Sequence, residues 1–585
     1  MSSARGTPPT LTRAAALWLG VLGCSAPGVP PTPERPKPQA QRDSLIIAVA
    51  SDPKDLLSVV SESAADSAVI EATGVQPMDV DFDCRMTYKP ALASSWIFSA
   101  DGRTITLSLR DDQVWEDGRP ITAEDYRYTF DLAADPNVGW PERASLRRLD
   151  ADARPKVVDA HTVAFQFTEA YDRATMLSHI TLPLVPRHIL DAPTVDRASL
   201  RTHPLNTTAP MAAGPFRIAS WEHGKKLTLD PNEKFVGPKE YKPKLKHVIF
   251  TVIPDYADRI AALARGDVDL VDAVSVADAD TLATDHPELA FHRRGWRSLD
   301  YVAWNNLDKD DYQVQAAAGA IDETSIRPHP LFGDADVRRA LTQAIDIDHL
   351  IQTLLVSPNS GEVYGRPAVG TITPALCSTH NDAIVRLGFD PAAARSRLQA
   401  LGWADSNGDG WLDKETRPLR FSLLTSSGNP RRAAAAGMIK ENLTAIGIDV
   451  QVETLAPEAL VDRLRRHDFD AALTGLSAGL WVDPSPVWGT GAEYNFTGYR
   501  NPEVDALLAA GLAEPDPERA RPIWRQFQQR IYEDQPATFL YWMDEVVALH
   551  TRFRNPTIDI VAPYRRLWEW SVPIDRVKYK EPPAP

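Results

Sequence analysis

Residues 90–130 read PALASSWIFSADGRTITLSLRDDQVWEDGRPITAEDYRYTF, a stretch in which the hydrophobic pattern changes from the period of a strand to that of a helix. Apolar and polar residues alternate over 104–110, and an Asp-Gly dipeptide at 101–102 separates this run from the run 96–100. Asp-Gly between two such runs is a strong signal for a β-hairpin. Farther on, Thr-Ala-Glu-Asp at 122–125 has the form of a helix capping box. The stretch therefore predicts a β-hairpin followed by a helix.

The chain beyond about Gly214 alternates strands and helices. The spacing of apolar residues predicts strands at 245–253, 268–271 and 448–452 and helices at 259–265, 337–345 and 439–446. Because strands and helices alternate in both halves of the chain, we predict two α/β lobes.

The size and charge of the chain limit the classes of function. With 585 residues it exceeds what one hydrophobic core usually organises, so two or more domains are expected. The formal net charge is −16, whereas a protein that binds nucleic acid needs a basic surface for the phosphates. We therefore exclude nucleic acid as a partner.

The N-terminus has the features of an export signal. Arg5 and Arg13 accompany a short apolar run, AAALWLGVLG at 14–23, which is too short to span a bilayer as a helix. The run leads into VLGC, which resembles a bacterial lipobox, so Cys24 is predicted to be acylated and to become the first residue of the mature chain; an ordinary secretory signal is the alternative. The Pro-rich residues 25–44 are predicted to form an extended tether. We expect a lipoprotein anchored on the periplasmic or cell-surface side of a membrane.

Six segments carry a family resemblance. The first is the stretch 90–130, with P-x-L-A-x-S-W, an Asp-Gly hairpin and W-x-D-G-x-P-x-T-A-x-D in sequence. The others are GPFRIASWEHGKKLTLDPNEKF (214–235), IPDYADRIAALARGDVDLVD (253–272), VRRALTQAIDIDHLI (337–351), FDPAAARSRLQALGWADSNGDGWLDK (389–414) and FDAALTGLSAGLWVDPSPVW (469–488). Together they resemble the peptide and nickel class, family 5, of ABC-transporter solute-binding proteins, which includes oligopeptide- and dipeptide-binding proteins.

The resemblance implies an α/β, two-lobed periplasmic-binding-protein fold of type II with an extra β-rich domain in the first lobe. On this sequence a signal peptide would occupy 1–23, a tether 24–44, the first lobe 45–80, 208–300 and 550–585, the inserted domain 81–207, and the second lobe 301–549. Such proteins hold a ligand between the lobes, which close by hinge motion. The implied partners of this monomer are a peptide or peptide-like small molecule and an ABC permease complex. Catalysis and a cofactor are not expected.

The resemblance also suggests residues that line the ligand cleft. They are aromatic side chains that could stack on a ligand and amides that could bond a peptide backbone, namely Trp481, Tyr494, Phe496, Trp304, Asn495 and Asn305, with Asp483 as the nearest acid. The alternative is that the aromatic residues pack in the core and the amides cap turns.

The acid that amine-binding relatives use is missing. In them an Asp three residues before an acidic-Pro pair holds the α-ammonium of the peptide. Here the pair is Asp483-Pro484, and Leu480 stands three residues before it. The resemblance therefore predicts that a free amino terminus is disfavoured unless Asp483 substitutes. A metal complex, a sugar or a peptide with a blocked amino end stays open as ligand.

Two short motifs suggest other chemistry. GLSAG at 475–479 fits the G-x-S-x-G pattern, so a serine hydrolase that uses Ser477 is the rival class; the only downstream histidine is His550. A sensor or chaperone on the same fold is a third class. The loop Asp405–Asp413 has oxygens at alternate positions, as in a calcium loop, but Thr416 stands where a bidentate Glu is needed. We therefore predict Asx turns there rather than a metal site, with structural calcium as the alternative.

The remaining cysteines are Cys84 and Cys377, far apart in the sequence and in different predicted lobes. They could pair in an oxidising compartment. A bond between lobes would hinder closure, so two free, buried thiols are the favoured prediction.

Overall fold

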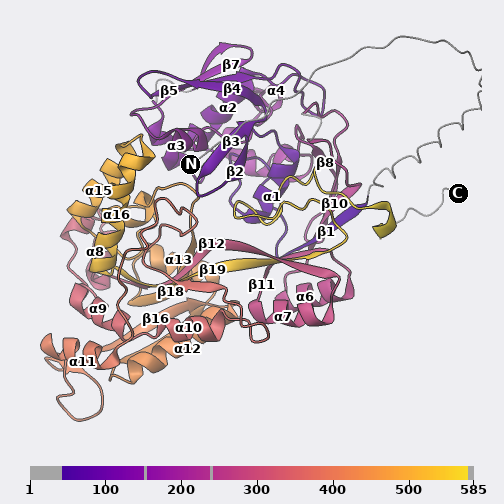
Figure 1. Ribbon diagram of the computed structural model, residues 1–585. Coiled ribbons are helices and arrows are strands. Elements are labelled where there is room, and N and C mark those ends of the chain that lie inside the picture. The colour runs from indigo at the N-terminus through magenta and orange to yellow at the C-terminus, as the bar shows by residue number, and fades with distance from the viewer. Residues whose placement is uncertain (1–42, 151–154, 238–240, 578–585) are drawn as a thin grey trace, which may run out of the picture. The chain divides into compact units, whose positions relative to one another are not determined.

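The structure is a computed structural model that describes residues 43–150, 155–237 and 241–577 (Figure 1). The largest feature of these residues is a mixed sheet with the order β17, β16, β18, β12, β19, β11, β1, β10, β9, β8, in which β13 also pairs with β19. The strands are β1 (Ser44–Val49), β8 (Phe216–Glu222), β9 (Lys226–Pro231), β10 (His247–Val252), β11 (Leu270–Val274), β12 (Leu289–Trp304), β13 (Gly365–Pro367), β16 (Arg420–Ser426), β17 (Asp449–Leu455), β18 (Ala471–Ser477) and β19 (Ala537–His550).

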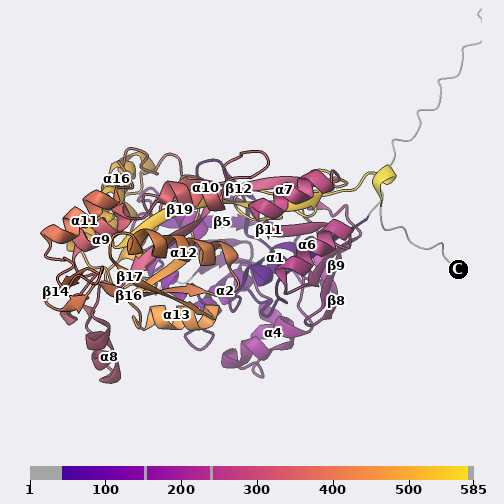
Figure 2. The ribbon, with the colours of Figure 1, turned by 90° about the horizontal axis from the view of Figure 1, so that it is seen from below.

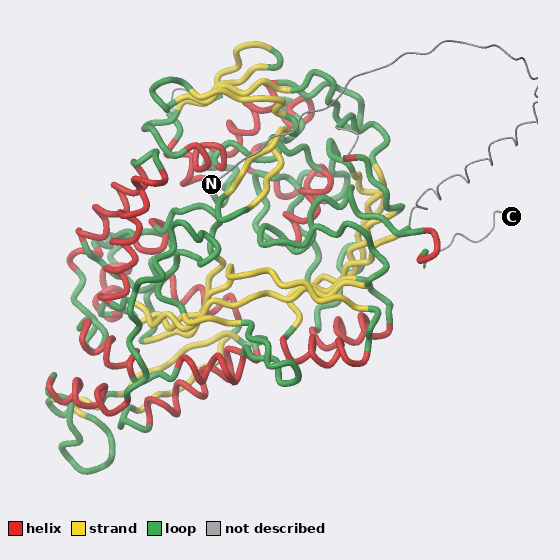
Figure 3. Tube along the Cα trace, in the orientation of Figure 1, coloured by secondary structure: helices red, strands yellow, loops and turns green. Residues whose placement is uncertain are grey.

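Two long antiparallel strands, β12 and β19, connect the two ends of this sheet. Their pairing runs from Leu289 opposite His550 to Ala303 opposite Ala537. At one end β19 pairs with β11, and at the other β12 pairs with β18 (Figure 3). The crossing strands therefore belong to both halves of the sheet.

Helices cover the sheet. The contacts place α6 and α7 against β11, β12 and β19, and α12 and α13 against β16, β17 and β18 (Figure 2). The helices of these two regions and of the C-terminal half are α6 (Tyr256–Arg265), α7 (Val276–Asp285), α8 (Lys309–Ala317), α9 (Ala335–Gln343), α10 (Ile347–Leu354), α11 (Pro391–Ala400), α12 (Pro430–Thr444), α13 (Pro457–Arg465), α14 (Ser485–Trp488), α15 (Pro502–Ala513) and α16 (Pro517–Asp534). Helix α6 ends at Arg265, as the predicted helix 259–265 does, and Gly266 follows it in the left-handed conformation.

Residues 78–207 carry a small sheet and short helices. The predicted hairpin is present as β4 and β5 with the Asp-Gly turn between them, and α2 starts after Thr122, whose backbone N–H donates to the Asp125 carboxylate over 2.9 Å. The elements are β2 (Met78–Phe82), β3 (Met86–Pro90), β4 (Ala93–Phe98), β5 (Thr104–Leu109), α2 (Ala123–Ala134), the 3-10 helix η1 (Arg143–Arg148), β6 (Lys156–Asp159), β7 (Thr162–Gln166), α3 (Arg173–Ser178), α4 (Arg187–Leu190), η2 (Arg197–Thr202) and α5 (Pro204–Thr207), preceded by α1 (Ala64–Thr73). The sheet order is β4, β5, β7, β6.

Buried apolar side chains gather in three regions. Clusters lie around β1 and β8 to β11, around β4, β5, β7 and α2, and around β16, β18 and the adjoining ends of β12 and β19. Leu57, Val59 and Val60 pack with α2 rather than with the strand that precedes them. The division into two lobes and an inserted domain stays a prediction.

The prediction of two free, buried thiols is wrong. Cys84 and Cys377 form a disulfide with their Cα atoms 5.3 Å apart, and Cys377 is exposed. Cys84 lies in the turn between β2 and β3, and Phe82 of the same hairpin packs against the cluster that contains Ile372 and Leu376. This contact brings together two segments that are 293 residues apart in the sequence.

Candidate functional site

A cavity of about 1670 Å³ opens among the described residues. Its walls come from α1, from η1 and α3, from the bulged part of β12, and from the loop that follows β18. It exceeds the range of about 300–1,000 Å³ that is common for small-molecule sites. The cavity therefore has room for a ligand larger than an amino acid.

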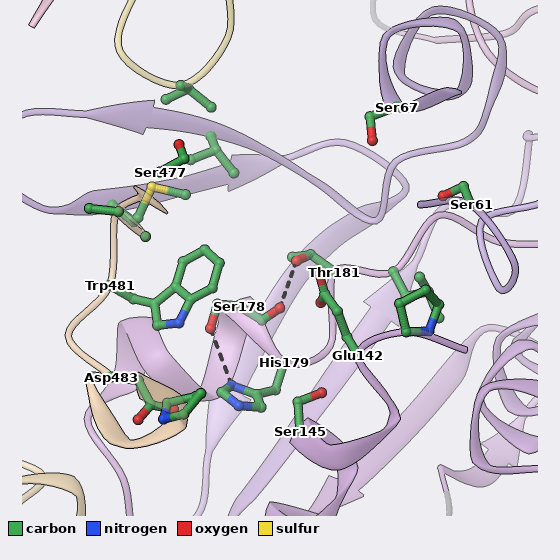
Figure 4. A pocket seen from close by; sticks show the side chains of 18 of the residues that line it. Ser61, Ser67, Glu142, Ser145, Ser178, His179, Thr181, Ser477, Trp481 and Asp483 are labelled. Atoms are coloured by element: carbon green, nitrogen blue, oxygen red, sulfur yellow. Dashed lines mark hydrogen bonds between the residues drawn. The ribbon is translucent and has the colours of Figure 1, made fainter. Parts of the chain in front are cut away.

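The loop after β18 supplies an apolar wall. Trp481 and Tyr494 are 42% and 40% exposed, although large aromatic side chains are usually buried. Both line the cavity, as does Phe496, whose ring meets the Tyr494 ring edge-on at 6.2 Å between centroids. In Figure 4 the Trp481 indole projects between Ser477 and Asp483. Three of the aromatic residues predicted for ligand contact thus lie on one cavity.

Asp483 also lines the cavity, but its charge is already compensated. Its carboxylate forms an ion pair with Arg148 of η1 at 2.6 Å, with both side chains largely buried. Its other oxygen accepts hydrogen bonds from the backbone N–H and the hydroxyl of Ser485. The pair links η1 to the loop after β18, and it leaves Asp483 poorly placed to hold an ammonium group.

His179 completes this network from the side of α3. Its Nδ1–H donates to the Thr175 carbonyl over 2.7 Å, so its Nε2 accepts from Arg148 over 2.9 Å. Burial and the neighbouring Arg148 lower the pKa of His179. The imidazole is therefore neutral and holds the guanidinium of Arg148 in position. Figure 4 shows Ser178, whose hydroxyl lies 3.2 Å from the same ring, beside it.

Three of the predicted ligand residues do not lie on this cavity. Trp304 is fully buried and donates to the Thr538 hydroxyl. Asn305 donates to the carbonyls of His467 and Phe469, and Asn495 to those of Gly489 and Tyr499. Trp304 packs in the core, and the amide groups of Asn305 and Asn495 bond loop carbonyls.

Leu480 is 3% exposed and is not among the cavity residues. A carboxylate at that position would therefore be buried away from the cavity. The structure adds cavity residues that the sequence did not reveal, among them Arg148, His179, Glu142, Arg297 and Arg565. None lies in a recognisable motif.

Ser477 is the last residue of β18, and a loop follows it where a nucleophile elbow would start a helix. Ser477 pairs with Ser298, whereas His550 pairs with Leu289, nine residues away on β12. At about 3.3 Å per residue this separates Ser477 from His550 by roughly 30 Å. His179, on the same cavity, has both ring nitrogens engaged. Neither histidine is placed to activate Ser477.

The loop 405–413 folds as a series of Asx turns. The Asp405 carboxylate accepts the backbone N–H groups of Gly408 and Gly410, and the Asp413 carboxylate accepts from Ser406. Within the described ranges no group of three or more His, Cys, Asp or Glu side chains is placed to hold a metal ion.

Comparisons with known proteins identify the family of this chain. Residues 87–498 match the model of the bacterial extracellular solute-binding proteins, family 5 (middle). The oligopeptide-binding protein AppA of Bacillus subtilis is 27% identical over 523 residues, 88% of each chain. The probable D,D-dipeptide-binding periplasmic protein DdpA of Escherichia coli is 25% identical over 535 residues, 89% of this chain and 93% of its own.

Solved structures show the same fold. AppA from B. subtilis in complex with a nonapeptide has a TM-score of 0.74 at 24% identity, over 92% of this chain and all of that chain. NikZ from Campylobacter jejuni in complex with Ni(L-His) has a TM-score of 0.72 at 21% identity, over 91% of this chain and 99% of its own. The predicted periplasmic-binding-protein fold is thereby confirmed. No helix among the residues described here has the length and apolar character to cross a bilayer. The chain belongs to the bacterial extracellular solute-binding proteins of family 5.

Proposed function

We propose that this protein captures a peptide-like ligand in the cavity between α1, η1, α3 and the loop after β18, and delivers it to an ABC importer without chemical change. The observation that carries the proposal is the cavity itself, whose volume of about 1670 Å³ suits a short peptide. A relative of the same fold, AppA, was solved with a nonapeptide.

The chemistry of the cavity wall supports a peptide. The backbone N–H groups of the cavity residues Gly479, Trp481 and Val482 carry no hydrogen bond within the part of the chain that the structure describes. Trp481 and Tyr494 offer aromatic surface beside them. Backbone donors next to aromatic faces suit an extended chain with varied side chains. Glu142, which lines the cavity and forms no ion pair among the described residues, is the candidate acceptor for an ammonium group.

The proposal includes export and anchoring. Cys24 and residues 25–42 lie outside the described residues, so the lipid anchor rests on the sequence VLGC alone. The predicted tether is two residues too long, because Asp43 is buried and Ser44 already pairs in β1. A lipid on Cys24 and a Pro-rich tether would keep the binding body close to a permease.

The test is capture of peptides from a mixture. The purified protein is incubated with random hexapeptides, separated from free peptide by gel filtration, and the retained peptides are identified by mass spectrometry. We expect the wild type to retain peptides and a Trp481→Ala, Tyr494→Ala variant to retain at least tenfold less. As a control, Val385→Ala removes an exposed apolar side chain elsewhere and should change nothing. A wild type that retains no peptide would contradict the proposal.

A further inference from the structure

An irregularity interrupts the crossing strands beside the cavity. The register of β12 against β19 shifts between Arg294 and Ser298, and Trp296 within this bulge has φ 63°, in the left-handed region. Such a conformation at a bulky residue is strained and is concentrated at functional sites. Bulges re-aim side chains next to binding sites. Here Arg297, the residue after Trp296, is one of the residues that line the cavity.

The guanidinium of Arg297 is held in place by neutral groups only. Nε donates to the Ala478 carbonyl over 3.1 Å, and Nη1 donates to the carbonyls of Ile560 and Val561 over 3.3 and 3.0 Å. Within the described residues Nη2 donates to no group, and no carboxylate forms an ion pair with Arg297. Three carbonyls therefore fix the guanidinium, and the two N–H groups of Nη2 remain available to a ligand.

No nearby carboxylate compensates the positive charge of Arg297. Glu545, which attracts it from a distance, forms an ion pair with Arg294 at 2.6 Å and accepts the hydroxyl of Ser298. Burial and Arg294 lower the pKa of Arg297, and the group stays charged at neutral pH. A partly buried cation without a partner is unfavourable until an anion reaches it.

The other arginines of the cavity differ from Arg297. Arg148 and Arg565 form ion pairs with Asp483 and Asp559. Arg147 and Arg465 are exposed, so water solvates their charge. The hydroxyl of Ser477, which lines the same cavity, donates to no acceptor within the described residues and adds a second donor.

We propose that Arg297 binds a carboxylate of the ligand through Nη2, so that the cavity selects peptides that carry a negative group at this point. The inference rests on the proposed function and adds the charge of its ligand. Charge-assisted hydrogen bonds from a fixed guanidinium to a carboxylate are strong and directional. The carboxylate is either the C-terminus of the peptide or an acidic side chain.

The experiment uses three mixtures of hexapeptides built from neutral residues. The first has a free C-terminal carboxylate, the second a C-terminal amide, and the third a C-terminal amide with one internal Glu. Equal amounts are offered together to the full-length protein, and the retained peptides are counted by mass spectrometry. The variants are Arg297→Gln and, as a matched control on the same strand, Arg293→Gln. Arg293 is paired with Asp544 and Glu362 and is not a cavity residue.

We expect the wild type and Arg293→Gln to enrich one of the two carboxylate mixtures over the plain amide roughly tenfold or more. Enrichment of the first mixture assigns the C-terminus, and enrichment of the third assigns an acidic side chain. Arg297→Gln should retain amide peptides with a ratio near one. Retention of all three mixtures in equal amounts by the wild type overturns the inference even if the variant does not fold. An unchanged ratio in a folded Arg297→Gln overturns it too. Retention of no peptide at all removes the proposed function and the inference together.

Discussion

The disulfide between Cys84 and Cys377 is predicted to be a major source of stability. It closes a loop across 293 residues. In the chain-entropy treatment, a loop of this length stabilises the folded state by about 6 kcal/mol at 25 °C, as an upper value. Divided by an unfolding entropy of about 2.1 cal/mol/K per residue over the whole chain, this corresponds to a fall in Tm of about 5 °C on reduction.

The perturbation is reduction by a phosphine and, separately, a Cys84→Ser, Cys377→Ser variant. Because Cys377 is exposed, a reductant reaches the bond without unfolding the protein. Differential scanning calorimetry measures Tm, and thiol titration shows how many cysteines are free. We expect the reduced wild type and the variant to melt at similar temperatures, several degrees below the oxidised protein.

The variant is its own control, because reductant should not change its Tm. An oxidised and a fully reduced wild type that melt within about 1 °C of each other would refute the reasoning. So would a protein from an oxidising compartment whose two thiols titrate as free.

Three further predictions concern single groups. Burial raises the pKa of Glu71, next to Arg565, from its ordinary 4.5 to about 7. Between about pH 4.5 and 7 the carboxyl group therefore loses its proton more readily in the unfolded chain, so the stability of the folded protein falls as the pH rises through this range. Tm measured against pH should be flatter in Glu71→Gln, and equal slopes in the two proteins would contradict this. Asp483→Asn leaves Arg148 without its carboxylate and should cost about 1–3 kcal/mol in denaturant unfolding, less when Arg148→Met is added; strictly additive losses would show that the pair is not coupled. Cys24→Ser should move the protein from the membrane to the soluble fraction of its host, and unchanged fractionation would refute the anchor.

The turns and helix ends of the fold could be predicted from short sequence signals. The Asp-Gly turn, the capping box at Thr122 and the helix end at Gly266 each depend on neighbouring residues, and the structure contains all three. The family resemblance added the type of fold, whereas no local signal contains the pairing of β12 with β19. The fold class could therefore be predicted from the sequence without knowledge of any contact between distant residues.

The cavity could be predicted only in part. Trp481 and Tyr494 lie in a loop that the family pattern marks, and their exposure follows from the cavity they line. Trp304 has the same chemistry but packs in the core, because the direction of its side chain depends on the strand it occupies. The ion-pair partner of Arg148, the carbonyl partners of Arg297 and the disulfide partner of Cys84 each lie more than 150 residues away in the sequence. Such pairs depend on tertiary packing that no spacing rule shows.

The central claim is that the cavity holds a peptide-like ligand, and native mass spectrometry of the protein isolated from its own host tests it most directly. Gentle ionisation keeps a bound ligand, and activation then releases it for sequencing. The account predicts a mass excess that resolves into short peptides, lost in the Trp481→Ala, Tyr494→Ala variant. A bound solute without peptide bonds, or a wild type that stays empty when peptides are added in excess, would contradict it.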